Sequence, residues 1–115
     1  APLDAAFMVL FYHDTAYDGT DRVAMNQAIY NALRPGGVFI VIDHHAPVGS
    51  RLAFVNDTHR IDAHVVREEV MAAGFILEAE SDMLANSGDD RTGNVFAPDL
   101  RRHTDRFVYR FRKPG

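Results

Sequence analysis

Residues 33–42 read LRPGGVFIVI, and this stretch decides the fold class. The Pro-Gly-Gly step at 35–37 ends a preceding helix, because proline cannot continue it and paired glycines permit a tight reversal. The residues after the step are all apolar and mostly β-branched, which is typical of a strand buried on both faces of a sheet. We therefore expect a helix, a sharp turn and a buried strand in that order.

A second apolar run lies upstream. Residues 4–11 read DAAFMVLF, which predicts another strand covered on both faces. Between the two strands, apolar residues recur at helical spacing from Met25 to Leu33, and Thr20 or Asp21 can cap that helix. Two buried strands joined by a helix predict a parallel pair with a right-handed crossover.

The remaining elements follow the same kind of pattern. Apolar positions at helical spacing predict a helix over 61–70, and Gly74 is placed to stop it. Residues 75–80 predict a third strand, and 84–104 form a long polar loop. Residues 106–112 alternate, which indicates an antiparallel last strand with one wet face. We expect an α/β fold with the strands in the order first, second, last, third.

Composition narrows the class of protein. The chain has 115 residues, enough for one hydrophobic core, and its net charge of −4 gives no general attraction to nucleic acid. There is no cysteine, which excludes disulfides, thiolate metal sites and a cysteine nucleophile. No apolar run reaches the roughly 18 residues that a membrane span needs. We expect no nucleic-acid or membrane partner and a cytoplasmic location, although an exported form is compatible with these residues.

Four segments, in the correct order and spacing, resemble a known family. The LRPGG turn, the run Ala73-Gly74-Phe75, the ending RFRKP at 110–114 and the segment 4–14 are similar to class I, Rossmann-like S-adenosylmethionine-dependent methyltransferases. Further pieces, such as FYHD at 11–14, look like an uncharacterised bacterial branch of that family. The resemblance implies that 1–115 is one partial domain: the C-terminal half of the sheet, from its fourth to its seventh strand.

The resemblance also implies a cofactor and the residues near it. S-adenosylmethionine would meet Phe11 and Tyr12, because the carboxyl end of the family's fourth strand faces the methyl group. The family holds this cofactor mainly through a Gly-rich turn and a ribose-binding carboxylate. No Gly-x-Gly turn before a helix occurs in this sequence. We therefore expect the isolated chain to be inactive and the parent protein to methylate a small-molecule acceptor.

Polar residues at strand ends are the candidates for chemistry, because ligands of open α/β sheets bind outside the carboxyl ends of parallel strands. His13 or His44 could accept a proton from a nucleophile, and Asp14 or Asp43 could orient that imidazole. The alternative is that these groups only cap helices and bind loops. The expected substrate-binding residues are His45, His59, Arg60, Arg91 and Arg101.

Two other functions stay open. Asp43-His44-His45 also resembles the motif of DHH phosphoesterases, which bind manganese, but that family's further Asp motifs are missing, and we expect no metal site. The second alternative is a non-enzymatic, self-associating module. The strand at 4–11 would lie at an apolar sheet edge with no Lys or Pro to block pairing, so we expect a homo-oligomer formed through that edge.

Overall fold

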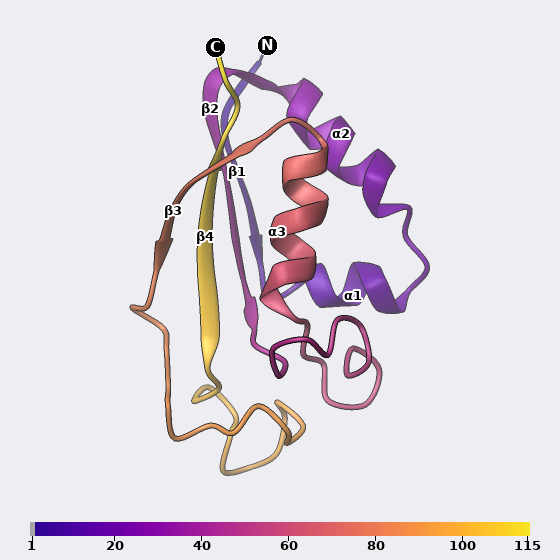
Figure 1. Cartoon of the computed structure of the whole chain (residues 1–115), viewed down its shortest axis with the longest axis vertical. Helices are drawn as coiled ribbons and strands as arrows, with labels where there is room; N and C mark the ends of the chain where they lie inside the picture. The colour runs from indigo at the N-terminus through magenta and orange to yellow at the C-terminus, as the bar shows by residue number, and fades with distance from the viewer. Residues whose placement is uncertain (1) are drawn as a thin grey trace.

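The computed structural model describes residues 2–115 and contains one four-stranded mixed sheet. Its strand order is β1-β2-β4-β3, with β1 and β2 parallel and both other pairings antiparallel (Figure 1). This confirms the predicted α/β class, strand order and antiparallel last strand. The elements are β1 Leu3–Val9, α1 Tyr12–Tyr17, α2 Arg22–Ala32, β2 Leu33–His44, α3 Ala63–Ala72, β3 Ile76–Ser81 and β4 Arg106–Arg112.

The irregular step near the start of β2 needs both Gly36 and Gly37. Gly36 has a φ of +81°, a conformation that residues with a Cβ rarely adopt. At Gly37, a Cβ would lie 2.9 Å from the carbonyl oxygen of Arg34 and 3.1 Å from that of Asp4. The second glycine therefore lets β2 approach β1 closely. Leu33 pairs with Leu3 before the two glycines, the register shifts there, and regular pairing resumes after them with Val38 opposite Ala5.

One face of the sheet carries the core. Phe39 and Val41 of β2 pair with Phe111 and Tyr109 of β4, and all four side chains are buried. Helices α2 and α3 contact each other and pack on this face (Figure 1). Asp21 caps α2 by accepting the N–H of Ala24, as the sequence predicts. No helix within residues 2–115 is long and apolar enough to cross a bilayer.

The opposite face is more open than the sequence predicts. Phe7 and Val9 of β1 are 66% and 53% exposed, and their β2 partners, Ile40 and Ile42, are only partly buried. The expectation that residues 4–11 would be covered on both faces is therefore wrong. The predicted position of β1 at the edge of the sheet is confirmed, but an apolar run alone does not distinguish a strand covered on one face from one covered on both.

A second difference follows β1 directly. The sequence predicts that the strand ends in polar groups and a loop, whereas Tyr12–Tyr17 forms the short helix α1. Leu10 makes the bend with a φ of +56°, and Thr15 closes the first turn by donating to the carbonyl of Tyr12 at 2.6 Å. Six residues are too few to show helical periodicity, so the pattern carries no signal. The predicted long loop is confirmed: residues 82–105 contain no helix or strand.

Candidate functional site

His13 and Asp43 meet at the carboxyl ends of the two parallel strands. His13 lies in the first turn of α1, just after β1, and Asp43 is the penultimate residue of β2. One carboxylate oxygen of Asp43 accepts the backbone N–H of His13 at 2.8 Å, and the other lies 2.8 Å from the ring Nδ1. The residues are 4% and 0% exposed, so this pair is a buried part of the sheet end.

The pairing decides which ring nitrogen of His13 is available. Asp43 is best satisfied when Nδ1 carries the proton, which leaves the lone pair on Nε2. Burial alone would lower the pKa of His13, but the hydrogen bond to Asp43 and the negative charges of Asp43 and Asp14 outweigh it and raise that pKa. Of the pairings that the sequence left open between His13 or His44 and Asp14 or Asp43, the structure brings His13 and Asp43 together, and their catalytic roles stay a prediction.

Asp14 and His59 lie on the Nε2 side of His13. The Nε2 atom is 3.3 Å from a carboxylate oxygen of Asp14, and the rings of His13 and His59 are 5.7 Å apart. One side-chain atom from each of the three residues lies within 4.8 Å of the other two. Asp14 and His59 are half-buried, so this cluster of His13, Asp14 and His59 opens towards solvent.

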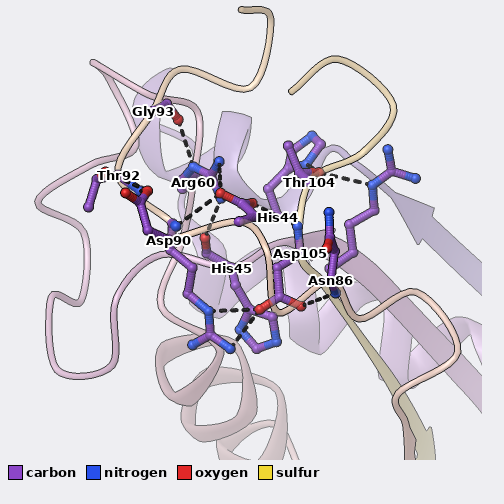
Figure 2. A network of polar contacts seen from close by, with 12 residues as sticks. His44, His45, Arg60, Asn86, Asp90, Thr92, Gly93, Thr104 and Asp105 are labelled. Atoms are coloured by element: carbon purple, nitrogen blue, oxygen red, sulfur yellow. Dashed lines mark hydrogen bonds and ion pairs between the residues drawn. The ribbon is translucent and has the colours of Figure 1, made fainter. Parts of the chain in front are cut away.

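The ring of His44 lies 5.8 Å from that of His13, but its hydrogen bond goes to the long loop and not to this cluster. Its Nδ1 lies 2.6 Å from the hydroxyl of Thr104 in the long loop (Figure 2). Burial lowers the pKa of His44 to about 3, with further contributions from His13 and Arg106. His44 is therefore neutral at physiological pH and holds the loop against the sheet. Its predicted catalytic role stays a prediction.

Arg60 anchors the same long loop through Asp89 and Gly93. Arg60 and Asp89 form a two-pronged ion pair at 2.8 and 2.9 Å, and neither side chain is exposed. The guanidinium also donates to the carbonyls of Gly93 and His45 (Figure 2). All of these bonds go to protein atoms, and the expected role of Arg60 in substrate binding stays a prediction.

The other predicted substrate-binding residues do not lie together with His13. His45 and Arg91 line a cavity of about 870 Å³ whose wall does not include His13, Asp14 or His59. Arg91 pairs with Asp105 at 2.8 Å. Arg101 is exposed in a turn of the long loop. Of the five predicted residues, only His59 lies beside His13.

The two predicted cofactor-binding residues differ in their exposure to solvent. Phe11 is 49% exposed next to the sheet end. Tyr12 is fully buried, donates to Glu69 at 2.9 Å and accepts from Asn26 at 2.9 Å. Burial and the charge of Glu69 raise the pKa of Tyr12, so its hydroxyl stays protonated. No sequence pattern identifies Glu69, Asn26 or Thr104 as partners of site residues, because each belongs to a different segment from the residue it contacts.

Among known proteins, the matches to this chain are to solved structures. No protein-family model matches the sequence, and no curated protein matches it. Solved structures do match over nearly the whole chain. A methyltransferase dependent on S-adenosylmethionine, from Mesorhizobium loti, aligns over 97% of this chain with a TM-score of 0.58 and 12% identity.

The chain has a class I methyltransferase-like fold. Two further structures agree: the [4+2]-cyclase SpnF, over 98% of this chain with a TM-score of 0.60 and 18% identity, and a complex between the Haloferax volcanii Trm112 methyltransferase activator and a methyltransferase, over 99% with a TM-score of 0.62 and 16% identity. This chain spans 62%, 50% and 55% of the three matched chains. The chain therefore covers about half to three fifths of the length of these matched structures.

Proposed function

We propose that this chain is the acceptor-side half of an S-adenosylmethionine-dependent methyltransferase that acts on a small molecule. The observation that carries the proposal is the cluster of His13, Asp14 and His59 at the carboxyl ends of β1 and β2, with Asp43 behind it. Ligands of this architecture bind at that edge of the sheet. The nucleophilic atom of the acceptor would be bound and activated at this cluster.

The cofactor would be held mainly by residues outside this chain. The matched methyltransferase from Mesorhizobium loti depends on S-adenosylmethionine, and this chain covers 62% of it. The 115 residues contain no Gly-x-Gly turn, the feature that lets a backbone approach such a ligand. Phe11, half-exposed beside the sheet end, would contribute an apolar contact near the methyl group.

The half-fold part of the proposal is tested by calorimetric titration of the 115-residue chain with S-adenosylmethionine. We expect no binding in the low-micromolar range. A low-micromolar constant would show that these residues hold the cofactor unaided, and it would contradict the assignment of the cofactor to another segment.

Self-association through β1 is the second candidate function. β1 lies at the edge of the sheet, and Phe7 and Val9 expose apolar surface beside that edge. A bare apolar edge favours pairing with another strand, from a second copy or from a cofactor-binding half. The fold alone does not establish methyl transfer, because the matched cyclase has the same fold and catalyses another reaction. Self-association therefore remains a separate candidate.

The phosphoesterase alternative has no support from the geometry. Asp43 binds His13, His44 faces Thr104, and His45 lines the separate cavity. Three neighbouring residues whose side chains diverge in this way do not make one metal site. We do not propose that function.

A further inference from the structure

We infer that His13, Asp14 and His59 form a binding site for one divalent first-row transition metal ion, with Zn²⁺ as the best-fitting probe. The nearest pair of candidate ligand atoms, Nε2 of His13 and an oxygen of Asp14, is 3.3 Å apart. Metal–ligand bonds of about 2.0–2.2 Å place neighbouring ligands at about 3.0–3.5 Å. The three candidate atoms lie within 4.8 Å of one another, so a small rotation of the half-buried Asp14 and His59 side chains completes the set.

Asp43 supplies the support that a metal-binding histidine needs. Histidines that bind metals commonly donate their other ring N–H to a carboxylate, which fixes the tautomer and the ring orientation. Asp43 sits 2.8 Å from Nδ1 of His13 and is fully buried. Nε2 is therefore held facing Asp14 and His59 before any ion binds.

The ligand types select the class of metal. Two imidazoles and one carboxylate suit zinc or iron(II), whereas magnesium and calcium prefer oxygen ligands only. Three protein ligands also leave at least one position open, as in catalytic zinc sites. His13 is buried, but Asp14 and His59 are half-buried, so the open position faces the solvent side.

A bound metal ion would determine which chemical group of the methyl acceptor binds at the site. A bound metal attracts an oxygen ligand and lowers the pKa of a hydroxyl that binds to it. The site would therefore take an acceptor through an oxygen atom, such as a hydroxyl or a carboxylate. This last step, unlike the metal site itself, rests on the proposed methyl transfer.

The site differs from the sequence-based expectation of no metal. That expectation considered residues adjacent in the sequence, Asp43-His44-His45. The structure instead joins His59 to the start of α1, because the segment between β2 and α3 folds back over the sheet end. No spacing rule connects residues so far apart.

The test is calorimetric titration of the tag-free 115-residue chain with Zn²⁺ alone, with Mg²⁺ for comparison. We expect one Zn²⁺ per chain in the micromolar range or tighter, no comparable Mg²⁺ binding, and a rise in melting temperature with Zn²⁺. His59→Ala and Asp14→Asn should each weaken Zn²⁺ binding at least about tenfold. His103→Ala, at an exposed histidine in the long loop, should leave it unchanged.

Two results would overturn the inference. One is that the wild type does not bind Zn²⁺ stoichiometrically; the other is that the His59 and Asp14 variants bind Zn²⁺ as tightly as the wild type does. His59 and Asp14 are half-buried, so their variants should fold, and the metal-free melting temperature checks this. Because the titration contains no S-adenosylmethionine, its failure leaves the proposed methyl transfer untouched. Failure of methyl transfer would likewise leave the metal site standing.

Discussion

The carboxylate of Asp43 holds His13 at two points, its backbone N–H and its ring Nδ1, each at 2.8 Å. The same carboxylate accepts the backbone N–H of His44 at 2.8 Å. His13 lies in the first turn of α1, directly after β1, and Asp43 lies near the end of β2. These contacts therefore hold α1 at the carboxyl ends of both parallel strands. The site's geometry therefore depends on one buried acidic residue.

Asp43→Ala should lower the free energy of unfolding by about 3 kcal/mol, since it leaves buried donors without an acceptor. Asp14→Ala is the matched control, because its carboxylate is partly exposed and should contribute less than about 1 kcal/mol. Urea denaturation of both variants measures the difference. Equal losses would show that Asp43 does not organise the sheet end.

Arg60→Met should be more costly than the loss of an ordinary ion pair. It leaves Asp89 buried without its partner, and breaking a buried pair costs about 3–5 kcal/mol. Arg51→Ala removes an exposed pair with Glu68, which solvent screens, and should leave the free energy of unfolding almost unchanged. The long loop should also become more sensitive to protease in the Arg60 variant only. A stable, protease-resistant Arg60 variant would contradict the anchoring role.

Asp62 gives a prediction for acid pH. It is buried as the N-cap of α3, where burial would raise its pKa, but the N–H groups of His64, Arg51 and Gly49 outweigh burial and lower that pKa below 3.8. A lowered carboxyl pKa stabilises the fold above pH 3.8, and this contribution is lost as pH falls through the folded-state value. The charged or titratable groups around Asp62 are His45, Arg51, His64, Glu68 and Tyr109.

Asp62→Asn keeps a capping side chain but removes this charge. In urea denaturation from pH 7 to pH 3, the wild type should be more stable than the variant at pH 7, and the difference should shrink below pH 3.8. A difference that stays constant down to pH 3 would show that Asp62 does not titrate differently in the folded state.

The β1 edge should make the chain self-associate. Light scattering at micromolar concentration should report a dimer or larger species for the wild type. Phe7→Lys puts a charge beside the exposed edge and should shift the chain towards monomer. Val23→Lys introduces the same charge at a still more exposed residue on α2, away from the edge, and should not. A monodisperse wild-type monomer would contradict self-association.

The sequence predicted the fold well because its signals are local. The LRPGG turn, the apolar strands and the alternation in β4 all depend on residues within a few positions of one another. The edge position of β1 was predicted, but its open face was missed, because an apolar run looks the same whether one face or both faces of the strand are covered. Helix α1 was missed because it is too short for periodicity.

The site was predictable in part. Parallel strand ends bring His13 and Asp43 together, and that pairing follows from topology alone. The positions of His59, Arg60 and Arg91 depend on two irregular segments whose paths are set by tertiary contacts such as Arg60 with Asp89. Sequence patterns carry no information about such contacts, so the grouping of His59 with His13 had to come from the structure.

Transfer of a labelled methyl group from S-adenosylmethionine to small oxygen-containing acceptors tests the central claim most directly. It should be measured on the 115-residue chain and on a longer version of the protein that includes a cofactor-binding half. We predict no transfer by the short chain, transfer by the longer one, and at least about a hundredfold slower turnover in the longer His13→Gln variant, with cofactor binding retained. The account is contradicted if the longer protein binds S-adenosylmethionine and the His13 variant transfers methyl groups at the wild-type rate.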